Sequence, residues 1–218
     1  MPSYTRHAHH MGAMYLLAMV ASIAGGMMIQ SVLLQTPLLT AVSGGRWLLI
    51  IGTSLEFINV VATFSIAFAL WAPLSKIYPS LATAYVGMRA LEAMVFLLAM
   101  AVPVTLLSLT GGTGQSAAQN ESLAAALVLL RNDNIAFLGP LVFAVTALLL
   151  YVALYKSRLV PRYIAVWGFV AALGIAGMNI FGLATALKPI VGLPMVLNEL
   201  WLGIYLLRKG FLPTATPS

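Results

Sequence analysis

The sequence predicts an all-α, polytopic bundle of six transmembrane helices. Of its 218 residues, 61% are hydrophobic and only 7% are charged, and the mean hydropathy is +1.00. Ordinary globular domains are about half apolar and about one-quarter charged, so this balance indicates an integral membrane protein. No stretch has the composition of an appended soluble domain. We therefore expect one transmembrane domain over residues 1–218.

Six apolar segments are each long enough to cross about 30 Å of hydrocarbon, which takes roughly 20 helical residues. Turn-forming sequences such as QTPLLTAVSGGR, PLSKIYPS and KPIVGLP separate them. The first segment has features of a secretory signal, but its apolar run continues to full spanning length, so we expect an uncleaved helix. The predicted spans are 11–34, 47–74, 81–109, 134–155, 163–187 and 192–208.

An even number of spans places both termini on one side of the membrane. Seven basic residues fall on that side, and three fall on the other, namely Arg46, Arg131 and Lys188. Because cytoplasmic loops carry the excess of Lys and Arg, this bias predicts that both termini lie in the cytoplasm.

A short basic loop follows the fourth span and contains Lys156, Arg158 and Arg162. These side chains are expected to contact anionic lipid headgroups, or to act only as determinants of topology. Since the basic residues occur at helix ends, the positive net charge does not indicate nucleic acid as a partner. The expected partner is the lipid bilayer.

The longest segment between spans, 110–134, is expected on the outer side. Leu123, Leu127 and Leu130 have the i, i+4, i+7 spacing of one apolar helix face, and Asn120 is the expected N-cap. This pattern predicts a short amphipathic helix in the outer loop between spans three and four. It would lie at the membrane interface or cover an outward-facing cavity.

The fifth span is rich in small residues at spacings of three to five positions. Such residues let helix backbones approach closely in lipid, so they predict packing rather than a functional role. No internal repeat is evident, and a paired-repeat transporter architecture therefore has no support. The small residues are Gly168, Ala171, Gly174, Gly177 and Gly182.

Four ionisable residues lie inside the predicted spans, where charge is costly and usually functional. They are Glu56, Arg89, Glu92 and Glu199. At 1.5 Å per residue, counting from the helix ends places the three carboxyls in one layer, slightly outside the midplane. The guanidinium lies about one turn closer to the cytoplasm. The amide side chains expected to join this layer are Asn59, Asn179 and Asn198.

Arg89 and Glu92 are three residues apart and therefore share a helix face. Arg89 can pair with Glu92 or with a carboxyl on a neighbouring helix, and such a pair could serve only to fix helix packing. Three carboxylates and one guanidinium cannot all be ionised in a dry site, because burial opposes uncompensated charge. We therefore expect a ligand-binding or proton-binding site that is open toward the outer face.

Other kinds of chemistry have little support. The chain has no cysteine, and its histidines, His7, His9 and His10, lie in an N-terminal tail that we expect to be mobile. The spans thus offer no ligands for a haem or a histidine-based metal centre, and no Ser-His-Asp set. A carboxylate site for a hard cation has no fixed geometry. No cofactor and no metal site are expected, and acid–base catalysis by carboxyls is only an open possibility.

Three stretches carry a resemblance: MRALEA at 88–93, YKSRLVPRYIAVWG at 155–168 and NELWLGIYLLRKGF at 198–211. They resemble a bacterial family of small multi-pass membrane proteins catalogued as domain of unknown function four-three-eight-six. Tyr163 stands where the family pattern has Trp, and Glu56 has no counterpart in it. The resemblance implies a location in the bacterial inner membrane, but it implies no activity. The resemblance marks Arg89, Glu92, Arg158, Pro161, Arg162, Trp167, Glu199, Lys209, Gly210 and Phe211.

The sequence leaves three functional classes open. The first is a protein that binds or transports a cationic or amphipathic small molecule, or protons, with Arg89 orienting the site and the glutamates as charge partners. The second is a non-catalytic accessory subunit of a larger membrane complex, whose partner proteins would cover one face. The third is an intramembrane enzyme, for which no nucleophile or metal set is identifiable.

Overall fold

The computed structural model describes residues 2–111, 116–182 and 187–213, and these residues form helices and no strand. Six helical segments in them are long and apolar enough to cross a membrane. The chain thus has the predicted all-α, multi-pass class. The elements are α1 (Pro2–Leu33), α2 (Leu38–Gly44), α3 (Arg46–Leu74), α4 (Pro79–Leu109), α5 (Ala117–Leu129), the π-helical η1 (Leu130–Ile135), α6 (Ala136–Ser157), α7 (Arg162–Ile180) and α8 (Lys188–Lys209).

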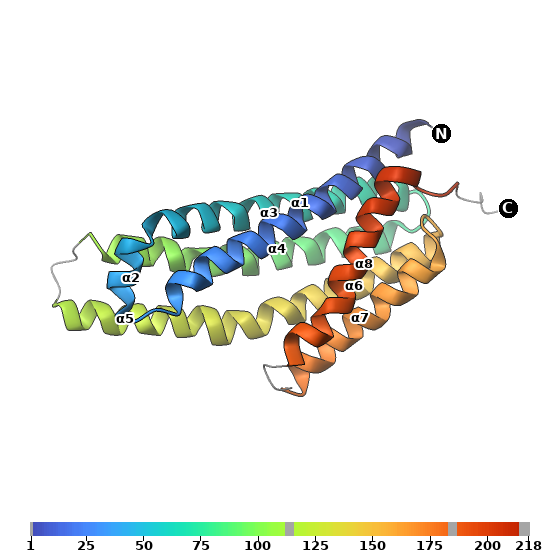
Figure 1. The fold of residues 1–218 in the computed structure, drawn as a ribbon. Helices are drawn as coiled ribbons and strands as arrows, with labels where there is room; N and C mark the ends of the chain where they lie inside the picture. Colours follow the sequence, from blue (N-terminus) through green and yellow to red (C-terminus); the bar gives the residue numbers. More distant parts are fainter. Residues whose placement is uncertain (1, 112–115, 183–186, 214–218) are drawn as a thin grey trace.

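The long helices run alongside one another, and α1 begins at the end of the bundle where α8 finishes (Figure 1). The helices α3 and α4 have bounds close to the second and third predicted spans. By contrast, α7 ends at Ile180 rather than at residue 187, and Gly182 follows with a φ of +60°, a conformation that glycine adopts readily.

The N-terminal histidines lie in the first turns of α1 rather than in a mobile tail. One of them, His10, has its Nε2 2.6 Å from the hydroxyl oxygen of Ser65 on α3. This contact and the packing of Ala8 and Met11, which are both fully buried, extend the helix beyond the predicted beginning of the span at residue 11. The apolar run therefore underestimates the length of α1, because polar residues at a helix end can still pack against a neighbour.

The segment predicted as a short outer-loop helix is helical as α5, but it continues through η1 into α6, so that 117–157 form one long helical segment. Its N-cap is Ser116, whose side chain accepts from the amide of Gln119 while the Gln119 side chain accepts from the amide of Ser116. This reciprocal capping box corrects the expectation that Asn120 caps the helix. Glu121 instead accepts hydrogen bonds from the amides of Leu38 and Leu39, at the beginning of α2.

The buried residues of α5 and the beginning of η1 are small or polar rather than leucines. Leu123 and Leu130 are exposed, whereas Asn120, Ala124 and Arg131 are buried. In a membrane protein, lipid is as apolar as leucine, so leucines can face outward while small and polar residues face the bundle. The spacing of the leucines correctly predicted a helix here, and the exposed Leu123 and Leu130 are turned away from the bundle.

Pairs of glycines bring α1 close to two other helices. A Cβ atom added to Gly25 would lie 2.8 Å from the carbonyl oxygen of Gly52 on α3, and one added to Gly12 would lie 2.7 Å from that of Gly203 on α8. Both distances are too short for a side chain, so glycine is required for these helix crossings. The crossing of α1 and α8 lies near the end of the bundle that carries the chain termini (Figure 1).

Two hydrophobic clusters divide the bundle along its length. The larger one, at the end with the termini, contains buried residues from all six long helical segments, among them Tyr15, Leu70, Tyr85, Leu150, Ile164 and Leu202. The smaller one, at the opposite end, is built from α1 to α5 only. The hairpin of α7 and α8 accordingly tilts away from the rest of the bundle toward that end (Figure 1). The space between the hairpin and the other helices is where the candidate site lies.

Candidate functional site

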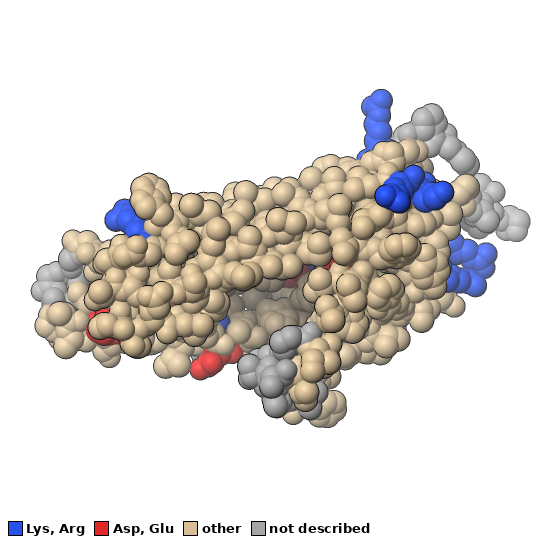
Figure 2. Space-filling model, viewed as in Figure 1, with Lys and Arg blue, Asp and Glu red and all other residues tan. Residues whose placement is uncertain are grey.

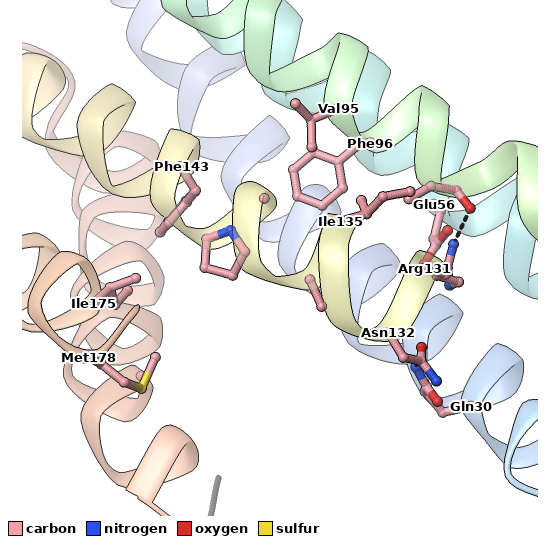
Figure 3. Close-up of a pocket in the computed structure, with 15 residues that line it drawn as sticks. Gln30, Glu56, Val95, Phe96, Arg131, Asn132, Ile135, Phe143, Ile175 and Met178 are labelled. Carbon is pink, nitrogen blue, oxygen red and sulfur yellow. Dashed lines mark hydrogen bonds and ion pairs between the residues drawn. The ribbon is translucent and has the colours of Figure 1, made fainter. Parts of the chain in front are cut away.

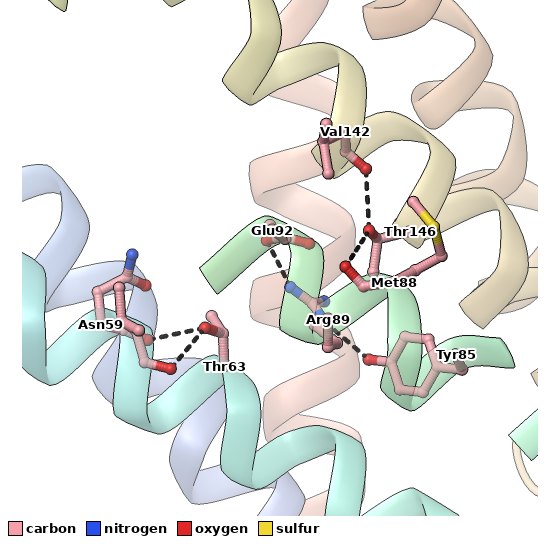
Figure 4. A network of polar contacts seen from close by, with 9 residues as sticks. Asn59, Thr63, Tyr85, Met88, Arg89, Glu92, Val142 and Thr146 are labelled. Atoms are coloured by element: carbon pink, nitrogen blue, oxygen red, sulfur yellow. Dashed lines mark hydrogen bonds and ion pairs between the residues drawn. The ribbon is translucent and has the colours of Figure 1, made fainter. Parts of the chain in front are cut away.

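A buried ion pair lies on α4. Arg89 Nη1 is 2.7 Å from Glu92 Oε1, and the two side chains are only 2% and 3% exposed. The Arg89 Nε also donates a 3.2 Å hydrogen bond to the hydroxyl of Tyr85, one turn earlier (Figure 4). Since all three residues belong to one helix, the local geometry of α4 is sufficient to hold the guanidinium in place.

A cavity of about 190 Å³ lies beside this pair, and we call it the proximal cavity because it is nearer to the chain termini. Side chains from five helices line it. Its polar lining consists of Tyr15 and Ser22 from α1, Asn59 and Thr63 from α3, Arg89 and Glu92 from α4, and Glu199 from α8.

The proximal cavity contains polar atoms that have no partner within the described part of the chain. Glu92 Oε2 and the hydroxyl of Tyr15 are buried without a hydrogen bond. Glu199 also lines the cavity and takes part in no hydrogen bond or ion pair with any described residue. Buried polar groups are nearly always satisfied, so Glu92 Oε2 and the Tyr15 hydroxyl are free to bind a polar group inside the cavity.

The charges that line the proximal cavity do not balance. Glu92 and Glu199 contribute two carboxyls, whereas Arg89 contributes the only cationic side chain among the described lining residues. Arg89 is already bound to Glu92. The carboxyl of Glu199 is therefore the group that a bound cation or a proton would neutralise.

A second ion pair joins two elements that the sequence did not bring together. Glu56 of α3 pairs with Arg131 of η1, whose other Nη donates to the carbonyl oxygen of Ala99 on α4 (Figure 3). Close by, the side-chain Nε2 of Gln30 on α1 donates a 3.0 Å hydrogen bond to Oδ1 of Asn132. Arg131 and Asn132 both lie on the π-helical turn, a rare geometry that often marks functional positions.

These four polar residues form one end of a larger cavity of about 410 Å³, which we call the distal cavity. The rest of its lining is mainly apolar and comes from α4, the end of η1, α6 and the tilted α7–α8 hairpin. These apolar residues include Val95, Phe96, Ile135, Phe143, Ile175 and Met178 (Figure 3).

Glu56 does not share a cavity with Glu92 and Glu199, so the expected layer of three carboxyls is wrong in its arrangement. Counting residues from helix ends gave a depth but no lateral position, and it could not anticipate the partner of Glu56. Arg131 was expected on the outer surface as a determinant of topology, yet it is only 9% exposed. The sequence did contain a signal for the position of Arg131. It follows Ala124 by seven residues and Asn120 by eleven, and these spacings place all three residues on one helix face.

The predicted amides have different roles. Asn59 lines the proximal cavity. Asn198 is fully buried and donates a 2.9 Å hydrogen bond to the carbonyl oxygen of Ile164, which ties α8 to α7. Asn179 donates to the carbonyl oxygen of Ile175 on its own helix, at 2.8 Å, and lines neither cavity. Only Asn59 is thus positioned to contact a ligand.

The two cavities are stacked along the bundle and share part of their walls. Ala99 lines the distal cavity two helical turns beyond Glu92, about 10 Å along α4. Gly192 is likewise two turns from Glu199 along α8. Phe96 and Phe143 line both cavities and so form the boundary between them.

The proximal cavity reaches the side of the bundle between α1 and α8. Its lining includes Ile23 and Val196, which are 51% and 38% exposed. Beyond the Gly12–Gly203 crossing, α8 diverges from α1, and Figure 2 shows a hollow in this region with acidic atoms inside it. In a membrane this opening would face the lipid.

The basic residues of the loop between α6 and α7 are exposed, as are those at the end of α8. The Arg162 guanidinium lies over the ring of Tyr155, 5.0 Å from its centroid. Most of the Lys and Arg side chains visible in Figure 2 lie at the end of the bundle that carries the termini. Since Arg131 is turned inward, it no longer counts among the surface charges of the opposite end.

Comparison with known proteins identifies a family but no activity. Among the described residues, no three His, Cys, Asp or Glu side chains are grouped so that they could hold a metal ion. The search of curated proteins and the search of solved structures each found no match. A family model described as Domain of unknown function (DUF4386) matches residues 10–210, which include both ion pairs and Glu199. The chain therefore belongs to the DUF4386 family of proteins, as its three motifs predicted.

Proposed function

We propose that this protein binds a small organic cation in the proximal cavity, as a multi-pass protein of a bacterial inner membrane. The observation that carries the proposal is the unpaired carboxyl of Glu199, which lines a cavity with one more carboxyl than cation among its described residues. A bound cation would supply the missing charge. It would also bring Glu199 the partner that intramembrane carboxylates usually have.

The size of the cavity favours an organic cation over a proton. A proton would need only the carboxyl, whereas a volume of about 190 Å³ exceeds the roughly 30 Å³ that one water occupies in the liquid. The cavity walls also include Ala18, Met19 and Phe96, which suit the alkyl groups of an ammonium ion. An aromatic ring near a cation adds a favourable electrostatic contact.

Each polar residue has a distinct proposed role. Glu199 accepts the cation, and the free Oε2 of Glu92 provides a second negative contact. Arg89 does not touch the ligand's charge but holds Glu92 through Oε1, which fixes the direction of Oε2. The unpartnered hydroxyl of Tyr15 and the amide of Asn59 complete the polar surface.

We propose that both termini face the cytoplasm. The exposed basic residues near the termini support this orientation, because they outnumber those at the other end. Lys156, Arg158 and Arg162 are exposed, and Arg162 lies over the ring of Tyr155. We propose that these three side chains contact anionic headgroups.

The proposal is tested by titrating tetramethylammonium into the protein in lipid nanodiscs, with empty nanodiscs as the blank. The Glu199→Gln variant should bind at least about tenfold more weakly, since it loses a charge–charge attraction of more than about 1.4 kcal/mol. The matched control is Asp133→Asn, which removes one negative charge from an exposed position on η1. Equal binding by the parent and the Glu199→Gln variant would overturn the proposal.

Native mass spectrometry of the protein, taken gently from its own membranes, separates this function from an accessory role. A small added mass that is lost in Glu199→Gln and kept in Asp133→Asn supports the binding site. A complex with a second protein that survives both substitutions, without any small added mass, indicates the accessory subunit instead.

A further inference from the structure

We infer that the cation carries an apolar tail and that the distal cavity binds this tail. The ligand class is thus an elongated amphipathic cation, with its charged head between Glu92 and Glu199. This inference rests on the proposed function and adds the shape and chemistry of the ligand to it.

The distal cavity suits an apolar group rather than a second charge. Its two charged lining residues, Glu56 and Arg131, are bound to each other, so they leave no net charge to attract an ion. Most other lining residues are aliphatic or aromatic, among them Val95, Ile175 and Met178. Burying an alkyl chain against such walls is favourable in proportion to the area that is removed from water.

The position of the distal cavity relative to Glu199 fits one continuous ligand. The two cavities are stacked with their polar layers about 10 Å apart, as the spacing of Glu92 and Ala99 along α4 shows. Phe96 and Phe143, which line both, are the side chains at the junction. A linear alkyl chain that passes between these two rings would contact apolar surface along its whole length.

The side opening explains how such a ligand would arrive. The proximal cavity meets the surface between α1 and α8, at Ile23 and Val196, within the part of the bundle that lipid surrounds. An amphipathic cation concentrates in the bilayer, because its tail prefers hydrocarbon and its head prefers the interface. It could therefore enter sideways, without crossing the layer of charged residues from water.

The test uses alkyltrimethylammonium ions with butyl, hexyl and octyl chains, together with tetramethylammonium, titrated into nanodiscs. In the parent protein, each added methylene should lower the Kd by about fourfold. The Gly139→Leu variant places a side chain in the distal cavity, where a Cβ atom would meet its first neighbour, Val95, only at 4.0 Å. In this variant the affinity should no longer rise with the length of the alkyl chain, whereas tetramethylammonium should bind as it does to the parent. Comparing the two proteins cancels the partition of the ligands into lipid.

The outcomes separate the inference from the proposed function. The same chain-length dependence in the parent and in Gly139→Leu overturns the tail site, whatever happens at Glu199. If Gly139→Leu does not fold, Gly192→Leu fills the same cavity from α8, where a Cβ atom has no neighbour within 4 Å. Glu199→Gln should weaken the binding of every ion in the series by the same factor. If it does not, the proposed function is overturned, even if Gly139→Leu removes the dependence on chain length.

Discussion

The two ion pairs differ in how they are assembled and in what surrounds them. Arg89 and Glu92 are neighbours on one helix, are almost completely buried, and share their cavity with the additional carboxyl of Glu199. Glu56 and Arg131 come from positions 75 residues apart, and Glu56 is 14% exposed. The first pair belongs to a cavity with an excess of negative charge, and the second belongs to a cavity that is electrically balanced. The excess charge is the basis of the proposed function, whereas the balanced pair links α3 to η1.

The largest expected effect comes from removing Arg89. The Arg89→Leu variant leaves Glu92 buried without a cation, and breaking a buried pair in this way costs about 3–5 kcal/mol. Chemical unfolding in detergent should show this loss. The double variant Arg89→Leu with Glu92→Leu should recover most of the stability. If the double variant is as unstable as the single one, the cost is due to packing rather than to charge.

Removing the other cation should have a smaller effect. In the Arg131→Leu variant, Glu56 loses its partner but has better access to water, so we expect a loss of about 2 kcal/mol. The same unfolding measurement allows a direct comparison with Arg89→Leu. A larger loss for Arg131→Leu than for Arg89→Leu would reverse the order of the two pairs.

Neutralising Glu199 should have the opposite sign. Without ligand, Glu199→Gln removes a carboxyl that has no partner among the described residues. The free energy of unfolding should therefore rise by about 1 kcal/mol, because residues kept for function often lower stability. Thermal unfolding of the ligand-free protein checks this gain. A loss of stability would mean that Glu199 has a structural partner in the free protein.

The smallest expected effect is that of the control substitution Asp133→Asn. Asp133 is exposed on η1, only two residues from Arg131, but it lines neither cavity. Its neutralisation should change neither the unfolding curve nor tetramethylammonium binding, because exposed substitutions away from special features are usually close to neutral. A clear change in either quantity would show that charge near η1 acts on the site at a distance.

Residues that are close in the sequence were the easiest to predict. The pairing of Arg89 with Glu92 was one of two arrangements foreseen, because helical periodicity alone places residues three apart on one face. Arg131 was missed because its position depends on α5 and η1 continuing into the bundle, which loop composition does not reveal. The leucine spacing of α5 predicted a helix but not which of its faces meets the bundle, since hydrophobicity does not distinguish lipid from protein interior.

By itself, the sequence determined the class of the protein, the approximate position of its membrane-spanning helices and the residues whose charge needs an explanation. These features follow from composition and from the spacing of apolar and charged residues over a few positions in the sequence. Only the tertiary structure decided which charges meet, because lateral neighbours in a helical bundle depend on the crossings of helices that are distant in the chain. The crossing at Gly12 and Gly203 and the tilt of the α7–α8 hairpin are examples, because residues of α8 line both cavities.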